Sequence, residues 1–311
     1  MPVLIGIDEA GYGPVLGPLV VSSAAFDVPE AAGEDLWQVL APAVARTRRE
    51  AAGRLIVADS KAVYSAARGL ADLERSVLSF LAAAGTRPAT FHELLGTLCE
   101  DAGALCSASW WSDCALPASA ASARIGASAA ALASAPGGVR FLGLHSQVVP
   151  TGPFNELIGR HRNKSVLLFH QNMLLIGRAM KRHDGDLSFV IDKHGGRHYY
   201  APLLSANFFG RTVRTLHQSP ESSAYEVALP GRTLRLTFIE KADVAYLPAA
   251  LASMACKYVR ELFMMCFNAY WCGRVKGLAP TAGYAADSSR FVDAIRPFFG
   301  DADEREIVRL R

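Results

Sequence analysis

Two short apolar runs, far apart in the chain, each end on acidic side chains. The run "LIGIDEAGYG" (4–13) places Asp8 and Glu9 directly before a glycine-rich turn, and "LSFVID" (187–192) ends on Asp192. Short apolar runs bounded by turn residues are typical of buried strands. Neighbouring carboxylates repel each other, and burial removes their hydration. The pattern therefore favours a sheet whose strand ends bring acids to one place, where cations compensate them.

Strands and helices alternate along the rest of the chain. The segment "TLRLTFIEKAD" (233–243) alternates in polarity and is expected to form a hairpin with "SAYEVALPG" (223–231). Helical spacing over 165–182 begins at Ser165, which is an expected N-cap. This order predicts one layered α/β domain. The other expected strands are 3–8, 17–27, 54–59 and 139–149, and the other expected helices are 34–46, 69–85, 248–270 and 287–299.

Composition restricts the class of protein. With 311 residues, 51% hydrophobic and 20% charged, the chain can bury a large core and is not extensively disordered. Its net charge of +3 means that a nucleic-acid partner must be met by a local patch. The six cysteines form no CxxC pair and are expected to be free thiols. No apolar run approaches the roughly 20 residues that span a bilayer, so a cytoplasmic protein without membrane contact is expected.

One region departs from the alternation. Residues 115–135 are dominated by alanine and serine, which favours a weak helix or a flexible insertion. Trp110 and Trp111 stand just before it. They are interpreted as anchors of the insertion, with a stacking platform for nucleic-acid bases as the alternative.

A further acid, Glu261, lies within "ASMACKYVRELFMM" (252–265). Ser253, Lys257 and Glu261 are spaced four apart and therefore share one face of the expected helix. If this face meets the strand ends, the carboxylates form an oxygen-rich set suited to Mg²⁺ or Mn²⁺. Two such ions about 3.5–4 Å apart can promote phosphodiester hydrolysis. Taken singly, Asp192 is as well explained as a strand-end turn residue and Glu261 as a solvated helix residue.

The opening "GIDEAGYGPVLGPLVV" (6–21) resembles the first motif of ribonuclease HII, the type 2 ribonucleases H. Three further segments match the family in the same order: "ADSKAV" (58–63), "FVIDKHGG" (189–196) and "KADVAYLPAALASMACKYVREL" (241–262). The segment "PTAGYAADSSRFVDAI" (280–295) resembles the family's Gly-Tyr segment and the helix after it. The match extends from residue 4 to about residue 296.

The resemblance implies a ribonuclease H-like fold, a mixed sheet flanked by helices, and endonucleolytic cleavage of the RNA strand of RNA–DNA hybrids. It implies catalysis with Mg²⁺ or Mn²⁺ held in a two-metal site by Asp8, Glu9, Asp192 and Glu261, leaving 3′-hydroxyl and 5′-phosphate ends. The expected domains are a catalytic region (1–275), with insertions near 89–138 and 198–232, and a C-terminal helical substrate-binding segment (276–311). Protein partners are not indicated.

Candidate substrate contacts follow from the same motifs. By resemblance, the glycine turn contacts the ribose 2′-hydroxyl, which tells RNA from DNA. Lys61 would contact phosphate and Tyr284 would pack on the sugar at the 3′ side of the cut. Without the resemblance, the pattern favours a solvated lysine and a half-buried core tyrosine at these positions. The full set of candidates is Gly11, Tyr12, Gly13, Ser60, Lys61, Lys164, His194, Arg197, Lys257 and Tyr284.

Residues 151–200 are rich in basic side chains. Two interpretations are open for them, a phosphate track and an ordinary solvated helix face. His194 or Arg197, just after Asp192, would meet the scissile phosphate or assist proton transfer. His194 and His198 also have a weak zinc-ligand spacing. The basic side chains in question are Arg160, Arg162, Lys164, Arg178, Lys181 and Arg182.

The chain departs from the family pattern at two of the named positions. The family turn usually holds Arg where this chain has Tyr12, and its fourth acid is usually Asp where Glu261 stands. Tyrosine brings no charge for a phosphate, so incision at a single ribonucleotide is less expected than cleavage of longer hybrids. Two alternatives remain open: a structure-selective DNA nuclease of the same superfamily, and a hybrid-binding protein with impaired catalysis.

Overall fold

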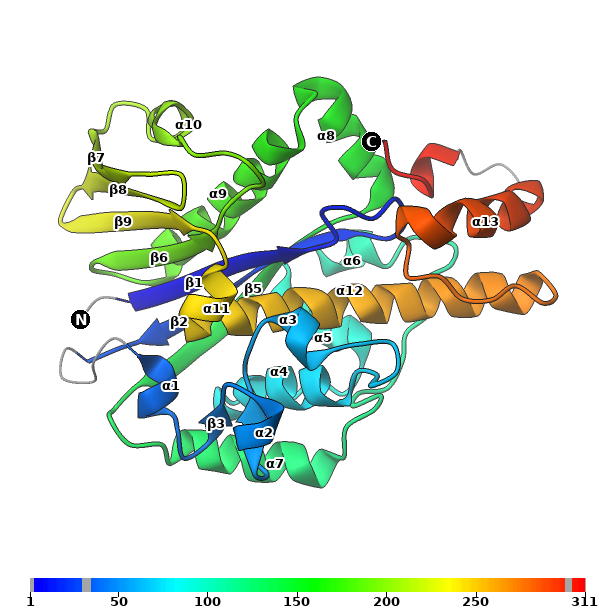
Figure 1. Cartoon of the computed structure of the whole chain (residues 1–311), viewed down its shortest axis with the longest axis horizontal. Helices are drawn as coiled ribbons and strands as arrows, with labels where there is room; N and C mark the ends of the chain where they lie inside the picture. The colour runs from blue at the N-terminus through cyan, green and yellow to red at the C-terminus, as the bar shows by residue number, and fades with distance from the viewer. Residues whose placement is uncertain (1–2, 30–34, 300–303, 311) are drawn as a thin grey trace.

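The computed structural model describes residues 3–29, 35–299 and 304–310. In this part of the chain the centre is a seven-stranded sheet in the order β5-β2-β1-β6-β9-β8-β7 (Figure 1). β1 pairs antiparallel with β2 and parallel with β6, so the predicted mixed sheet is confirmed. The strands are β1 (Val3–Ala10), β2 (Leu19–Asp27), β5 (Arg140–Val149), β6 (Leu187–Asp192), β7 (Val213–Gln218), β8 (Ser222–Leu229) and β9 (Arg232–Ile239).

Helices cover both faces of the sheet (Figure 1). α12 (Leu247–Arg274) lies along β1 and β2 on one face, and α4 (Ala71–Ala83) packs beneath it. The opposite face carries α8 (Thr151–His161), α9 (Lys164–Arg182) and α10 (Ala201–Asn207). The layer around α4 also holds α1 (Leu36–Val39), α2 (Arg48–Ala51), α3 (Ser60–Val63), α5 (Phe91–Leu98), α6 (Ala102–Leu105), α7 (Ser122–Ala133), and a two-stranded parallel sheet of β3 (Val44–Ala45) and β4 (Leu55–Ile56).

The close contact between β1 and α12 depends on Gly6. A Cβ atom at this position would lie 2.0 Å from the backbone nitrogen of Ala249, a distance that no backbone shift short of separating the two elements relieves. Since the glycine has no side chain, the first turn of α12 rests directly on the strand. The same contact determines how α12 is aligned along β1, that is, which turn of the helix lies beside each residue of the strand.

The C-terminal segment continues from α12 through α13 (Ala285–Ile295) and two short 3₁₀ helices, η2 (Arg296–Phe298) and η3 (Glu304–Glu306). Residues 304–310 then return to the glycine turn that follows β1. The backbone of Arg309 donates to Val15 O at 2.9 Å, and its Nη1 donates to Gly11 O at 2.5 Å. The division into a catalytic region (1–275) and a substrate-binding segment (276–311) stays a prediction.

Several sequence-based expectations need correction in detail. The helix expected over 34–46 is only the four-residue α1, because the chain then enters β3. Asn163, and not Ser165, caps α9, since its Oδ1 accepts from the backbone nitrogens of Ser165 and Val166 at 2.9 and 3.3 Å. The predicted hairpin of β8 and β9 is present. None of the helices in the described ranges has the length and hydrophobicity to cross a membrane.

The alanine- and serine-rich stretch forms α7, which packs on α4. Glu74 of α4 is fully buried and holds the segment before α7. Its carboxylate accepts from the backbone nitrogens of residues 118–120 at 2.6–2.7 Å and from the Tyr258 hydroxyl at 2.7 Å. The Trp110 and Trp111 rings pack against phenylalanines of α12 and α5, as expected for anchors.

Candidate metal centre and active site

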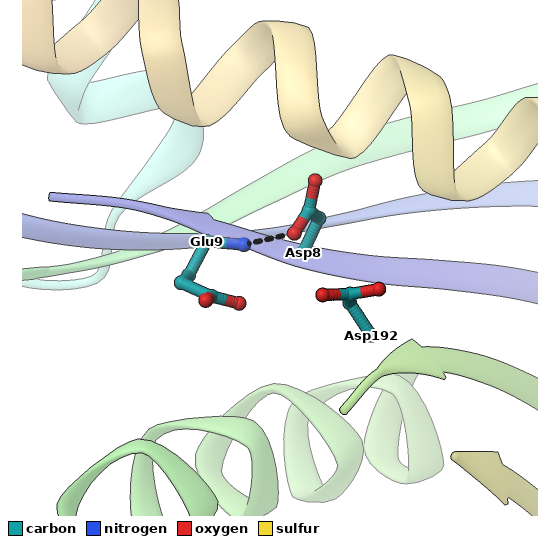
Figure 2. A group of neighbouring side chains, drawn as sticks. All are labelled: Asp8, Glu9 and Asp192. Carbon is teal, nitrogen blue, oxygen red and sulfur yellow. Dashed lines mark hydrogen bonds between the residues drawn. The ribbon is translucent and has the colours of Figure 1, made fainter. Parts of the chain in front are cut away.

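Three carboxylates meet where β1 and β6 end. Asp8, Glu9 and Asp192 each offer an oxygen, and these oxygens all lie within 4.8 Å of one another (Figure 2). The parallel register pairs Ile7 with Ile191, so the next residue of each strand is an acid facing the same space. Within the described residues this is the one group of three or more metal-ligating side chains at such separations. The predicted convergence of these three acids is therefore seen in the structure.

Alternation along β1 explains how two adjacent acids serve one site. Ile5 and Ile7 point into the core beneath α8 and α9, whereas Gly6 faces α12. Asp8 therefore lies on the α12 side of the strand end and Glu9 on the α9 side. The backbone nitrogen of Glu9 donates to Asp8 Oδ1 at 2.7 Å, which fixes the Asp8 carboxylate at the strand end (Figure 2).

The site is strongly unfavourable to negative charge in the absence of cations. Burial, followed by the charges of Glu9 and Asp192, raises the pKa of Asp8 well above its usual value. Burial and the Asp192 charge raise the pKa of Glu9 from 4.5 to about 8. Burial also raises the pKa of Asp192, although Ala242 N donates to its Oδ1 at 3.0 Å. Mutual repulsion of this kind disappears when a cation sits between the carboxylates.

The donor set fits a hard divalent cation. All three side chains offer carboxylate oxygens, the ligands that Mg²⁺ and Mn²⁺ prefer, and soft sulfur and imidazole donors are not part of the group. The nearest thiol is that of Cys256, which is buried and donates to the backbone oxygen of Asp8 at 3.1 Å. The site thus matches the predicted cofactor class, and the choice between the two metals stays a prediction.

A fourth carboxylate, Asp243 in α11 (Ala242–Ala245), lies outside the group of three but close enough for its charge to act on them, and it was not among the predicted residues. Its charge raises the pKa of both Asp8 and Glu9. Burial, then Asp59 and Asp192, raise its own pKa from 3.8 to about 6. The sequence did not single it out, because Asp243 lies four residues after Ile239 and the acid directly after β9 is Glu240.

Glu261, the predicted fourth ligand, does not join the acid group. Its carboxylate accepts from Lys257 Nζ at 2.6 Å and from the Tyr64 hydroxyl at 2.8 Å, and Arg260 Nη1 lies 3.4 Å away. The Asp8 carboxylate instead receives a hydrogen bond from Ser253. Ser253 and Glu261 are eight residues apart in α12, or about 12 Å along the helix axis. Glu261 thus belongs to a separate ion-pair cluster, and the prediction is corrected.

Lys257 belongs to this separate cluster as well. Besides its ion pair with Glu261, its ammonium lies 4.6 Å from the centre of the Tyr64 ring. Arg260 is almost fully buried and donates from Nη2 to Leu16 O at 3.2 Å and to Ala282 O at 3.0 Å. The cluster therefore joins α12 to the glycine turn and to the segment before α13. Substrate contact by Lys257 stays a prediction.

The two glycines of the turn have different roles. Gly11 has a φ of +86°, and a Cβ there would lie 2.5 Å from Pro18 O. No other residue can adopt this conformation in this space without strain. Gly13 is exposed, and a Cβ added there would meet no atom within 4 Å, so its backbone is open to an approaching ligand. Its proposed contact with a ribose is compatible with this exposure.

Lys61 lies in α3 and is exposed. Its positive charge partly opposes the rise in pKa that burial causes at Glu9, Asp192 and Asp243. Asp59 caps the same short helix by accepting from Lys61 N at 2.9 Å. Ser60 is buried, and its hydroxyl lies 3.2 Å from that of Ser253. Ser60 is thus a link between α3 and α12, whereas Lys61 is an exposed residue of the same short helix.

Tyr12 lines a pocket next to the glycine turn. The pocket has a volume of about 520 Å³ and is lined by Tyr12, residues 163–165 and residues 194–199; we call it the Tyr12 pocket. Lys164 and Arg197 are both part of its wall, as predicted substrate-binding residues. Arg197 Nε donates to the Ser165 hydroxyl at 2.7 Å.

His194 is buried in the structure, and its role at the scissile phosphate stays a prediction. Its side chain is 1% exposed, and burial lowers its pKa to about 3. Its Nε2 lies 2.9 Å from Asn172 Nδ2. His198 instead contacts Lys193 and Pro220, so the two imidazoles do not share a metal site among the described residues.

The solvent exposure of the side chains bears on two other predictions, the sugar contact of Tyr284 and the phosphate track. Tyr284 is 48% exposed and its ring lies 5.7 Å from Arg260, so it is not a core residue and is available for a sugar contact. Arg178 is buried and donates to Leu98 O at 2.9 Å, which removes it from any continuous phosphate track. The exposed Arg160 lies 3.7 Å from Glu156, an ordinary helix-surface pair.

No protein-family model matches the sequence, and no curated protein matches it. The chain is similar to type 2 and type 3 ribonucleases H of known structure. One is the PCNA:RNase HII complex from Archaeoglobus fulgidus, with 17% identity and a TM-score of 0.47, covering 99% of this chain and 94% of that chain. Another is ribonuclease H2 from Pyrococcus horikoshii OT3, with 17% identity and a TM-score of 0.46, covering 99% and 92%.

A third similar structure is Bst-RNase HIII in complex with Mn²⁺, with 14% identity and a TM-score of 0.42, covering 99% of this chain and 66% of that chain.

Proposed function

We propose that this protein is a metal-dependent endonuclease that cleaves the RNA strand of RNA–DNA hybrids. The observation that carries the proposal is the convergence of Asp8, Glu9 and Asp192, whose oxygens lie within 4.8 Å of one another beside a glycine turn. Paired carboxylates at such distances suit two divalent cations and phosphodiester hydrolysis. The resemblance of the turn and of three further segments to ribonuclease HII supports the hybrid as substrate.

The chain's own residues have distinct parts in the proposed reaction. Asp8, Glu9 and Asp192 would hold Mg²⁺ or Mn²⁺, and Asp243 in α11 would supply a fourth carboxylate. When bound, the ions supply an activated water and stabilise the leaving oxygen. Lys61 would attract the scissile phosphate, because its positive charge acts on Glu9 and Asp192. The proposed products carry 3′-hydroxyl and 5′-phosphate ends.

Recognition of RNA is assigned to the glycine turn. The exposed backbone at Gly13 lets a ribose approach closely, and Gly11 gives the turn its shape. The 2′-hydroxyl is the group by which a protein tells RNA from DNA at one site. The exposed Tyr284 would pack on the sugar beyond the cut. Arg260 links the two elements, since it donates to Leu16 O and Ala282 O.

Three labelled duplexes test the proposal: an RNA–DNA hybrid, DNA with one ribonucleotide, and plain DNA, each with Mg²⁺ or Mn²⁺. Cleavage of the hybrid within its RNA strand is the expected result, with the single-ribonucleotide duplex cut more slowly or not at all. Cutting of plain DNA alone would overturn the assignment and favour a structure-selective DNA nuclease. Binding of the hybrid without any cutting would indicate a protein with impaired catalysis.

The identity of the fourth acid is tested by a matched pair of variants, Asp243→Asn and Glu261→Gln. Each replaces one carboxylate by its amide. Asp243→Asn is expected to weaken Mn²⁺ binding, measured by calorimetry, and to lower hybrid cleavage on the order of a hundredfold. Glu261→Gln is expected to leave the Mn²⁺ affinity within about threefold of the parent, because its carboxylate is paired with Lys257. The opposite ranking would restore Glu261 as a ligand.

A further inference from the structure

The Tyr12 pocket is lined by two cationic side chains, Lys164 and Arg197, that have no part in the proposed cleavage reaction. We propose that it binds a non-scissile phosphate of the nucleic-acid backbone, with Arg197 and Lys164 as the charged contacts. This inference rests on the proposed function, because it gives the same substrate a second point of attachment. The pocket is lined by Tyr12 of the glycine turn, the start of α9 and the loop after β6. It therefore adjoins the acid site without being part of it.

Arg197 is oriented but not neutralised. Its Nε donates to the Ser165 hydroxyl at 2.7 Å, which holds the guanidinium against the wall of the pocket. Among the residues that the structure describes, no carboxylate forms an ion pair with Arg197, and no protein group accepts from its Nη atoms. A guanidinium held through Nε presents its two Nη groups as a fork, the geometry that binds a phosphate through two hydrogen bonds.

The other walls add to the preference for an anion. α9 is 19 residues long and begins at Lys164, so the positive end of its dipole faces the pocket. His194 also lines this wall, but it is 1% exposed and is not one of the charged contacts.

The phosphate bound here is not the one that is cut. Lys61 is the cation whose charge acts on Glu9 and Asp192, whereas the charge of Arg197 acts on Tyr12. The Glu9 charge acts on Tyr12 as well, and the Tyr12 hydroxyl would lie 3.8 Å from a Cβ atom at Gly195, so Tyr12 borders both the acid group and the pocket. A backbone that places one phosphate at the acids would pass Tyr12 before reaching Arg197. The pocket thus takes a neighbouring phosphate and helps set the position of the strand.

The test measures binding of a fluorescent RNA–DNA hybrid in EDTA, so that no cleavage occurs. Single phosphates are replaced in turn by uncharged methylphosphonates, in each strand. With the parent protein, one position is expected to lose affinity on the order of tenfold, as for a charge-assisted hydrogen bond. In Arg197→Gln that position is expected to cause no further loss, and the slope of log K against log salt falls by about one.

Two further variants make the result specific. Arg49→Gln removes the same charge from an exposed site in α2, outside the pocket, and is expected to keep the position-dependent loss. Ser165→Ala keeps the charge of Arg197 but removes the acceptor that orients it, so the loss at that position should become smaller. Circular dichroism and unfolding curves verify that each variant is folded.

The outcomes separate this inference from the proposed function. Equal methylphosphonate effects in the parent and Arg197→Gln proteins at every position would overturn the pocket assignment, even if the hybrid is cleaved normally. If the hybrid is not cleaved in Mg²⁺ or Mn²⁺, the proposed function fails. The same methylphosphonate scan on plain DNA would then decide whether the pocket binds a backbone phosphate, because both duplexes carry that group.

Discussion

The metal-free protein is expected to lose stability as the pH rises through neutrality, and a divalent cation is expected to restore it. The reason lies in the acid group, where burial and repulsion raise the pKa of Asp8 and Asp192 and bring that of Glu9 from 4.5 to about 8. A carboxyl group with a raised pKa binds more protons in the folded than in the unfolded state between the two values. The free energy of unfolding therefore falls with pH in that window.

The size of the effect follows from linkage. One such carboxyl group changes the free energy of unfolding by at most ~1.4 kcal/mol per pH unit. For Glu9 alone, a change from about pH 6 to about pH 7.5 therefore costs roughly 2 kcal/mol. Asp243 has a pKa of about 6, so its contribution to the fall in the free energy of unfolding ends at a lower pH than that of Glu9. A cation present at a hundred times its dissociation constant would return ~2.7 kcal/mol.

Denaturant unfolding at several pH values, with EDTA or with Mn²⁺, measures both effects. The Asp192→Asn variant is the control, because it removes one of the repelling charges and one ligand. It should show a shallower fall with pH in EDTA and little gain from Mn²⁺. If the metal-free parent is equally stable or more stable at the higher pH, or if Mn²⁺ stabilises Asp192→Asn as much as the parent, the reasoning is refuted.

Three further substitutions test the framework, each by its free energy of unfolding. Gly6→Ala should cost about 3 kcal/mol or more, because the new Cβ meets the backbone of Ala249 at 2.0 Å; a smaller loss would show that α12 can shift. Glu74→Gln should cost about 3 kcal/mol, since its amide would face backbone N–H donors, and an unchanged denaturation midpoint would contradict this. Gly11→Ala should destabilise by about 1–3 kcal/mol whereas Gly13→Ala should change stability by less than about 0.5, and equal effects would argue against the strained turn.

The sequence was sufficient to predict the acid triad because its signal is local. A short apolar run predicts a strand, and an acid directly after the run lies at the strand end. β1 and β6 are both of this kind, and a parallel register aligns Ile7 with Ile191. The helices α4, α9 and α12 also follow from periodicity, with ends within a few residues of those expected. The short α1 was overestimated because its apolar residues continue into β3.

The fourth acid could not be chosen from helix periodicity. Spacing identifies the residues that share a face of α12, but it does not say which turn of that face lies at the end of β1. The contact of Gly6 with Ala249 decides this, and it brings Ser253 to Asp8. Glu261 is two turns further along. The rule that found Asp8 and Asp192 does not select Asp243 either, because the acid directly after β9 is Glu240, which pairs with Lys193.

The ion pairs of Glu261 also explain an acidic side chain at this position without a metal. Arg260 and Lys257 both approach its carboxylate, and Arg260 is only 1% exposed. A buried guanidinium without a counter-charge is costly, and removing one partner of such a pair typically destabilises a protein by about 3–5 kcal/mol. The same guanidinium donates to Leu16 O, after the glycine turn, and to Ala282 O, just before Tyr284. Without Glu261, Arg260 would lose its counter-charge and would hold the glycine turn and the segment before Tyr284 less firmly. The free energy of unfolding and the affinity for the hybrid would therefore fall, while the metal site stays intact. Affinity for Mn²⁺ and affinity for the hybrid should consequently respond to different acids.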